Sequence, residues 1–271
     1  MSILELPKRI LVTGASRGIG RELALLLAQS GHTTVLAARS REDLEAVARE
    51  ILARGGRAEV LPMDVTDDAS VARAVAELLS VGPCDVVVNN AGSLDQAWFV
   101  EQSSETQRRE MEVNYWGALR VTRALLPSLL ARGAGSVVNV SSLLGGVAST
   151  TTANYCATKA ALEAWSFALR REVERHGVKV TVFVAPHTET EMGGRARFEG
   201  VRSLPAAYTA AELARAIDRA PRKYAGSPVY RFLLWLARVA PSFMEARVSA
   251  SALRAVGAPP EGRRASEAAT G

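Results

Sequence analysis

A tyrosine and a lysine four residues apart, Tyr155 and Lys159, are the residues of this chain best suited to proton transfer. Residues at positions i and i+4 share one face of a helix, so the phenol and the ammonium would point into the same space. Tyrosine normally titrates near ~10, and a cation within about 4–6 Å favours the phenolate and lowers that pKa. The spacing therefore predicts a phenol that can exchange a proton near neutral pH.

Three glycines, Gly14, Gly18 and Gly20, follow the first short apolar run of the chain. Glycine lets the backbone come close to a pyrophosphate, and the N-terminus of the following helix favours its negative charge. No Gly-Lys-Ser/Thr sequence follows, which excludes a P-loop. A tight loop without a ligand has a similar composition, but the position between a strand and a helix favours a dinucleotide site.

Short β-branched runs alternate with segments of helical apolar spacing up to about residue 186. The valines at 86–88 form an uninterrupted apolar run, which is typical of a parallel sheet covered on both faces. The alternation predicts an α/β fold, namely a Rossmann-type doubly wound parallel sheet with helices on both faces. The expected strands are 10–12, 33–37, 58–61, 86–88, 136–140 and 179–184, and the expected helices are 19–29, 40–53, 67–79, 105–131 and 153–176.

A length of 271 residues suits one α/β domain with a large core. We expect a single dinucleotide-binding catalytic domain at 1–256 and a disordered tail at 257–271. Within the domain, 187–256 would form the substrate loop and C-terminal helices. The alternation stops after Pro186, and 187–207 read as a loop with a short helix.

The composition is that of an ordinary globular protein, with 48% hydrophobic and 23% charged residues. Cys84 and Cys156 offer neither a disulfide framework nor metal-ligand spacing, so we expect a reducing, cytoplasmic compartment and no metal. No apolar run after positive charge opens the chain, so no secretory signal is expected. Residues 190–271 carry 13 Lys/Arg against 7 Asp/Glu, but no basic helix with base-reading spacing accompanies them, and no nucleic-acid partner is expected.

Five motifs in order resemble the short-chain dehydrogenase/reductase family: residues 13–20, residues 89–92, Asn114, Ser142 and residues 155–159. The resemblance covers residues 8 to about 186. It implies a Rossmann-type domain that binds a nicotinamide cofactor and interconverts carbonyls and alcohols. Each motif alone has a structural explanation, because a Tyr/Lys pair is usually a solvated helix face and Asn114 could be a helix-surface residue. Their joint spacing favours catalysis.

The four expected catalytic residues, Ser142, Tyr155, Lys159 and Asn114, would each have a different role. Ser142 ends a strand, which places its hydroxyl at the carboxyl edge of the sheet, where it can donate a hydrogen bond to a carbonyl oxygen. Tyr155 would exchange the proton with that oxygen, and Lys159 would lower the pKa of Tyr155. By the resemblance, Lys159 would also hold the nicotinamide ribose, and Asn114 would hold a water that links Lys159 to solvent.

The cofactor preference is predicted from the end of the second strand. A carboxylate there would accept the adenosine ribose hydroxyls and repel a 2′-phosphate, but this chain has Ala37, Ala38 and Arg39. Arg39 and Arg17 could together bind a phosphate, which favours NADP(H); as mere surface charges they would leave the preference weak. The expected cofactor-binding residues are Gly14, Ser16, Arg17, Gly18, Ile19, Gly20, Arg39, Asp64, Val65, Asn90, Ala91, Gly92, Tyr155, Lys159, Pro186 and Thr190.

The segment after the last expected strand departs from the family pattern. The family usually has Pro-Gly and then a threonine that contacts the nicotinamide amide, whereas this chain has His187 after Pro186. Thr190, or else Thr188, would take the role of that threonine. His187 could be a pocket residue. Earlier in the chain, next to Tyr155, Cys156 is expected to be a packing residue.

We also expect a C-terminal apolar helix at 228–239, within a segment from Pro228 to Pro241 that contains arginines beside its apolar run and is too short to span a bilayer. It could be a lid over the substrate pocket, a subunit contact, or a peripheral membrane contact. With the basic C-terminal region it favours a bulky lipophilic substrate, such as a long-chain acyl or keto lipid or a steroid-like molecule. Trp98 and Phe99 would be pocket wall or core.

We therefore expect an NADP(H)-dependent reductase of ketones or aldehydes, or alcohol dehydrogenase. By the resemblance, subunits would pair as a homodimer or homotetramer through 105–131 and 153–176. The alternatives are a catalytically silent cofactor-binding regulator and a peripheral membrane-associated protein of the same fold.

Overall fold

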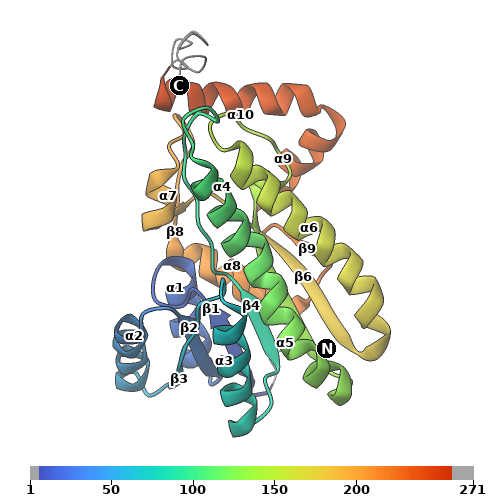
Figure 1. The fold of residues 1–271 in the computed structure, drawn as a ribbon. Helices are drawn as coiled ribbons and strands as arrows, with labels where there is room; N and C mark the ends of the chain where they lie inside the picture. Colours follow the sequence, from blue (N-terminus) through green and yellow to red (C-terminus); the bar gives the residue numbers. More distant parts are fainter. Residues whose placement is uncertain (1–5, 258–271) are drawn as a thin grey trace, which may run out of the picture.

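The computed structural model describes residues 6–257, and a seven-stranded parallel sheet forms its centre (Figure 1). The strand order is β3-β2-β1-β4-β5-β6-β9, so the order reverses between β1 and β4. Ligands of doubly wound sheets bind beyond the carboxyl ends of the strands at this reversal. The strands are β1 (Arg9–Thr13), β2 (Thr33–Ala38), β3 (Arg57–Pro62), β4 (Val86–Asn89), β5 (Gly135–Ser142), β6 (Val178–Ala185) and β9 (Lys223–Tyr224).

Helices cover both faces of the sheet, which confirms the predicted fold class. Successive side chains of a strand point to opposite faces, so Ile10 and Val12 of β1 pack on one side and Leu11 on the other. The first side is covered by α1 (Gly18–Gln29), α2 (Arg41–Ala53) and α8 (Ala206–Arg219). The second is covered by α3 (Asp68–Val81), α5 (Gly117–Arg132) and α6 (Ala153–Val173).

The single long helix predicted at 105–131 consists of three parts. It begins as α4 (Ser104–Met111), widens into the π-helical turn η1 (Glu112–Trp116) and continues as α5. A π-turn inserts an extra residue into the helical ladder and commonly marks a functional site. Here the turn contains Asn114, whose side chain is almost fully buried. The prediction of one long helix is confirmed in its extent, and the π-helical turn around this buried amide is what the sequence did not predict.

The chain after β6 is more regular than the sequence suggested. Where a loop with a short helix was expected, the structure has the short helix α7 (Glu191–Arg195) and two short paired strands, β7 (Thr188–Glu189) and β8 (Leu204–Pro205). The seventh strand β9 and the helices α8 and α10 (Pro241–Val256) were not predicted, whereas α9 (Pro228–Val239) was. Of the tail predicted at 257–271, all but Gly257 lies outside the described residues.

Gly20→Ala should destabilise the turn between β1 and α1. A Cβ at Gly20 would overlap the carbonyl oxygen of Gly14, and the backbone would have to shift. We expect the free energy of unfolding to fall by about 1–3 kcal/mol, measured by urea unfolding followed by circular dichroism. Gly194→Ala is the matched control, because nothing lies within 4 Å of a Cβ there. Equal stabilities of the two variants would contradict the prediction.

Candidate active site

The glycine turn opens the N-terminus of α1 toward solvent. Gly14 and Gly18 have φ angles of +66° and +57°, a region that side chains disfavour. Arg17 is the N-cap residue of α1, and its side chain makes no capping hydrogen bond. The first turn also contains no acidic residue. The amide N–H groups of this turn therefore have no side-chain acceptor from Arg17 or from a first-turn carboxylate. Together with the positive end of the helix dipole, they can bind an anion.

The segment after β4 is clamped to this turn. Thr13 Oγ1 accepts hydrogen bonds from the backbone N–H groups of Asn90 and Ala91, each at 3.0 Å. Asn90 Nδ2 in turn donates to the Thr13 carbonyl oxygen at 2.9 Å. Asn89 is buried and donates to Asn139 Oδ1 at 2.7 Å. The 89–92 motif thus fixes the shape of the cleft floor.

A cleft of about 770 Å³ lies over the glycine turn and reaches the ends of β2 and β3. Gly20 does not line it and instead packs against Gly14, and the predicted ligand contact of Gly20 stays a prediction. The other predicted cofactor residues from the first six elements and the loop after β4 line it together: Gly14, Ser16, Arg17, Gly18, Ile19, Arg39, Asp64, Val65, Asn90, Ala91, Gly92 and also Thr190.

Charged groups of both signs stand at the rim of this cleft. Arg17 forms an ion pair with Glu191 of α7, with 2.5 Å between Nη1 and Oε2. The exposed Arg39 lies near Asp64. Burial raises the pKa of Asp64, but hydrogen bonds from Thr66 and the charge of Arg39 outweigh burial, so the pKa lies below its usual value.

A second cavity of about 240 Å³ contains Ser142, Tyr155 and Lys159, and Pro186 also lines it. It shares Ile19, Asn90, Gly92 and Thr190 with the larger cleft, so the two are parts of one site. The predicted catalytic groups and the predicted dinucleotide cleft are therefore adjacent.

Tyr155 and Lys159 lie on the first turns of α6 and are 8% and 4% exposed. The Lys159 ammonium donates to the Val140 carbonyl oxygen of β5 at 3.0 Å and lies 5.6 Å from the centre of the Tyr155 ring. Ser142 ends β5, and its hydroxyl is near enough to the Tyr155 phenol to oppose the rise of the pKa of Tyr155. The three side chains thus meet at the carboxyl edge of the sheet.

Burial controls the proton affinities of this pair. It raises the pKa of Tyr155 to about 12, against the hydrogen bond of Ser142, which lowers it. It lowers the pKa of Lys159 to about 8, against the charge of Glu163, which raises it. The expected net lowering of the Tyr155 pKa is therefore not found in the protein alone, because desolvation of the phenolate outweighs the influences that lower the pKa. Tyr155 is therefore a neutral phenol, ready to donate a proton.

Asn114 acts between the loop after β4 and α6. Its Nδ2 donates to the Ser93 carbonyl oxygen at 2.8 Å and to Thr158 Oγ1 at 3.1 Å. Its Oδ1 accepts from the Ser93 backbone N–H at 2.7 Å. These bonds hold the cleft floor against the catalytic helix, so the π-turn has a positioning role. The water predicted beside Asn114 stays a prediction.

Glu163 is a site residue that the sequence analysis missed. It follows Tyr155 and Lys159 on the same face of α6, one helical turn further on, and is 6% exposed. Its Oε1 accepts from Ser141 Oγ at 2.8 Å, and its Oε2 pairs with Lys223 Nζ of β9 at 2.6 Å. The repeated i+4 spacing in the sequence was the available signal.

Of the two threonines after β6, Thr190 faces the cleft. Thr190 lies against the glycine turn, because its Cγ2 would be 3.0 Å from a Cβ at Gly18. It also caps α7 by accepting from the Gly193 N–H at 2.9 Å. Thr188 is 5% exposed, and its hydroxyl bonds the Pro186 carbonyl oxygen and Thr209.

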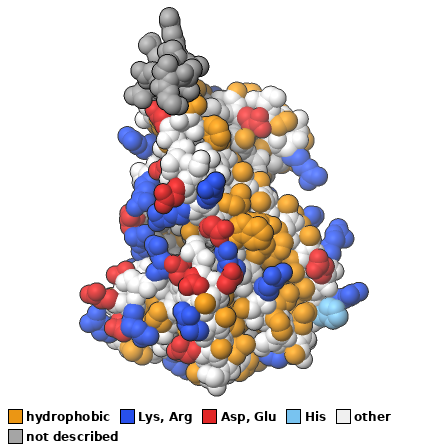
Figure 2. Space-filling view, in the orientation of Figure 1, with side chains coloured by type: hydrophobic (Ala, Val, Ile, Leu, Met, Phe, Trp, Pro, Cys, Tyr) orange, Lys and Arg blue, Asp and Glu red, His pale blue; other side chains and the backbone are white. Residues whose placement is uncertain are grey.

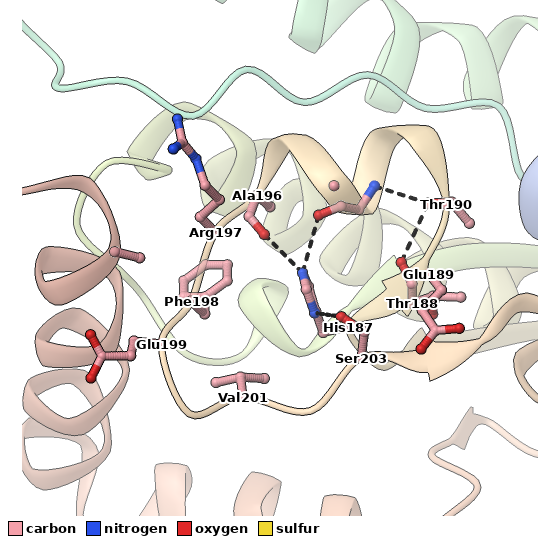
Figure 3. Close-up of a pocket in the computed structure, with 13 residues that line it drawn as sticks. His187, Thr188, Glu189, Thr190, Ala196, Arg197, Phe198, Glu199, Val201 and Ser203 are labelled. Atoms are coloured by element: carbon pink, nitrogen blue, oxygen red, sulfur yellow. Dashed lines mark hydrogen bonds between the residues drawn. The ribbon is translucent and has the colours of Figure 1, made fainter.

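His187, where the family pattern has glycine, ties the substrate segment together (Figure 3). Its Nε2 lies 2.9 Å from the Ala196 carbonyl oxygen and 3.2 Å from that of Gly193. Two carbonyl acceptors require an N–H at Nε2, which leaves Nδ1 to accept from Ser203 Oγ at 2.7 Å. Both ring nitrogens are thus hydrogen-bonded, so His187 has a structural role in the pocket wall.

The walls of the smaller cavity are apolar. Tyr230 and Leu233 of α9 close one side, which agrees with a lid role for this helix. Phe99 is 66% exposed, so neither a core nor a pocket-wall position is correct for it. Cys156 is buried, as expected of a packing residue. The remaining apolar lining residues, which the sequence did not reveal, include Leu144, Val147, Met192, Phe198, Met244 and Val248.

Among residues 6–257 no helix combines the length and apolar character needed to cross a bilayer. The same residues contain no group of three side chains placed to hold a metal ion.

Comparison with known families identifies the family to which this chain belongs. The model of the short chain dehydrogenase family matches residues 8–199. The chain belongs to this family. The ketoacyl reductase HetN of Nostoc is 36% identical over 187 residues, covering 69% of this chain and 65% of that protein. The fatty acyl-CoA reductase of Acinetobacter baylyi is 37% identical over 190 residues, covering 68% and 64%. The matches thus span slightly less than two thirds of these relatives.

Solved structures support the fold. A short-chain dehydrogenase from Streptomyces avermitilis superposes with a TM-score of 0.78 at 32% identity, covering 89% of this chain and 96% of that one. A gluconate 5-dehydrogenase from Burkholderia cenocepacia in complex with NADP and tartrate has a TM-score of 0.73 at 28% identity, covering 79% and 89%.

Glu163→Gln should change the pH dependence of the site. The variant keeps an acceptor for Ser141 but loses the charge that raises the pKa of Lys159. Because that pKa is about 8, the ammonium of the variant should lose its proton at lower pH. We expect the alkaline limb of kcat/KM for carbonyl reduction to move down by roughly one pH unit. Glu172→Gln, exposed on the same helix, is the control. Uniformly reduced activity without a shift would mean a merely structural role.

Proposed function

We propose that this protein is an NADP(H)-dependent oxidoreductase that interconverts a lipophilic ketone or aldehyde and its alcohol. The supporting observation is the meeting of Ser142, Tyr155 and Lys159 in an apolar-walled cavity that continues into the dinucleotide cleft. Membership of the short chain dehydrogenase family supports the same reaction class.

The residues of the cleft suit a dinucleotide. The first-turn amides of α1 lack a side-chain cap, and the close approach of Thr190 to Gly18 leaves no room for larger side chains there. The pyrophosphate would lie at this helix N-terminus, and Asp64 and Val65 would border the adenine end. When bound, the nicotinamide would supply or accept the hydride.

Side chains of the protein would carry out the proton transfer. In reduction, Ser142 Oγ and Tyr155 Oη would both donate hydrogen bonds to the substrate oxygen as its negative charge grows. The proton of Tyr155 Oη would then move to that oxygen and leave a phenolate. Lys159, with a pKa of about 8, is largely protonated at neutral pH and stabilises this phenolate electrostatically. Oxidation would run the same transfer in reverse.

The NADP(H) preference rests on charge at the end of β2. Ala38 offers no carboxylate to the adenosine ribose, and Arg39 is exposed at the cleft. Arg17, the second candidate for the 2′-phosphate, would share its charge with Glu191. The complex of the Burkholderia relative with NADP is consistent with this preference.

The substrate class follows from the walls of the small cavity, which come mainly from apolar side chains of the 143–147 turn, the 192–201 segment, α9 and α10. Such walls favour alkyl or polycyclic groups over sugars. HetN and the Acinetobacter reductase are named for ketoacyl and fatty acyl-CoA substrates, which supports a long-chain acyl compound here.

A silent regulator is the weaker candidate. Its support was the altered segment at His187, and the ring of His187 is occupied in holding that segment together. The three proposed catalytic residues, Ser142, Tyr155 and Lys159, are all present.

We also propose a homodimer or homotetramer that pairs through α4–α5 and α6. Figure 2 shows apolar side chains gathered over α4 and α5, where Trp116 is 45% exposed.

Tyr155→Phe should abolish turnover while dinucleotide binding remains. The ring stays in place and only the transferable proton is lost, so kcat should fall by about 10²–10⁴-fold. NADPH fluorescence titration should give an unchanged Kd. Tyr208→Phe, at a tyrosine 42% exposed on α8, is the control. Undiminished reduction by the Tyr155 variant would refute the mechanism.

Arg39→Asp should switch the dinucleotide preference. A carboxylate there would repel the 2′-phosphate and accept ribose hydroxyls, so NADPH affinity should fall by about 10–100-fold and NADH use should rise. The ratio of kcat/KM for the two dinucleotides measures this. Arg49→Asp, exposed near the end of α2, should leave the ratio unchanged. An unchanged ratio in the Arg39 variant would remove it from the phosphate site.

The chain length of the substrate should matter strongly. Each added methylene buried in the apolar cavity should raise kcat/KM by roughly two- to fourfold until the cavity is full. A series of aliphatic ketones and aldehydes, followed by NADPH absorbance, measures this slope. A flat series, or faster turnover of small sugars, would contradict the lipophilic assignment.

A further inference from the structure

Helix α9 is apolar on both of its sides. Its inner side contributes Tyr230 and Leu233 to the substrate cavity and packs Ala237 against Val147. Its outer side carries large apolar residues at helical spacing that face solvent. Their exposed fractions are 63% for Val229, 56% for Phe232, 56% for Trp235 and 56% for Val239, and these four residues are here called the outer stripe.

A helix at a protein surface normally turns polar residues outward, and one that is apolar all round is normally covered. The outer stripe therefore indicates a binding surface. The rings of Phe232 and Trp235 stack with their centres 5.7 Å apart, which makes one broad aromatic area. Phe243, at the start of α10, is 57% exposed.

The charges around the stripe identify the partner. Residues 220–256 contain six Lys/Arg and a single acidic residue, Glu245. Arg231 and Arg238 of α9 and Arg247 of α10 are all exposed. Aromatic side chains beside arginines are the combination that places a helix in the headgroup region of an anionic membrane.

A second copy of the chain fits this surface less well. Two-fold pairing would bring the same patch against itself, so the arginines of one copy would approach those of the other. Like charges held close across an interface oppose association. An anionic lipid surface, in contrast, complements the arginines and accepts the aromatic rings.

We propose that α9 docks on an anionic lipid surface, with the outer stripe inserted among the headgroups and Arg231 and Arg238 at the phosphates. Figure 1 shows α9 and α10 gathered at one end of the molecule, so a planar surface can reach them. The helix then separates the bilayer from the substrate cavity that its inner side lines. A lipophilic substrate would enter the cavity from the membrane; this last step alone rests on the proposed function.

Vesicle sedimentation tests the docking. The full chain should bind vesicles of phosphatidylglycerol and phosphatidylcholine and bind pure phosphatidylcholine much more weakly. Phe232→Ser with Trp235→Ser should lower the partition coefficient at least about tenfold. Arg231→Ser with Arg238→Ser should lower it about 30-fold on the anionic vesicles. The matched controls are Phe99→Ser with Val100→Ser, exposed to 66% and 80%, and Arg49→Ser with Arg73→Ser.

Both variant pairs should keep the circular dichroism spectrum and the dinucleotide affinity of the unchanged protein, because the altered side chains are exposed. Tyr155→Phe should bind vesicles normally, so failure of the proposed chemistry and failure of docking are distinguishable. Vesicle binding that survives the Phe232 and Trp235 changes would overturn the proposal. So would a dimer, seen by sedimentation velocity without lipid, that these changes dissociate.

Discussion

Lys159 carries an ammonium group into a part of the protein where water hardly reaches it. The cost of burying this cation is reduced by the Val140 carbonyl oxygen and by the charge of Glu163 one helical turn away. Glu163 is held in turn by Ser141 and by Lys223 of the last strand. The end of β5, the start of α6 and β9 are therefore joined through one charge, and this arrangement places Tyr155 beside Ser142.

The two halves of the cleft differ in polarity because different parts of the chain build them. The sheet reversal and the glycine turn provide backbone amides and charged rims for a dinucleotide. The segments after β6 provide apolar walls, with His187 as an internal strut and α9 as the outer cover. The Tyr155 phenol, located at the boundary, thus lies between the polar cleft on one side and the apolar cavity on the other.

The sequence was sufficient for the first six strands of the sheet, for the glycine turn and for bringing Tyr155 and Lys159 to one helix face, because β-branched runs and i+4 spacing are local patterns. It was insufficient where the outcome depends on burial. The pKa of Tyr155 rises to about 12 because desolvation exceeds the effect of nearby charge, and no spacing rule shows that balance. The π-turn at Asn114 depends on partners from α6 and the loop after β4. The strand β9 is only two residues long, too short for a recognisable pattern.

The central claim is that the dinucleotide and the buried phenol share one cleft at the carboxyl edge of the sheet. A crystal structure of the complex with NADPH tests it most directly. The account predicts density for the pyrophosphate at the N-terminus of α1 and for the nicotinamide ring beside Tyr155 and Lys159. A nicotinamide located elsewhere, or a Tyr155 ring turned away from it, would contradict the account.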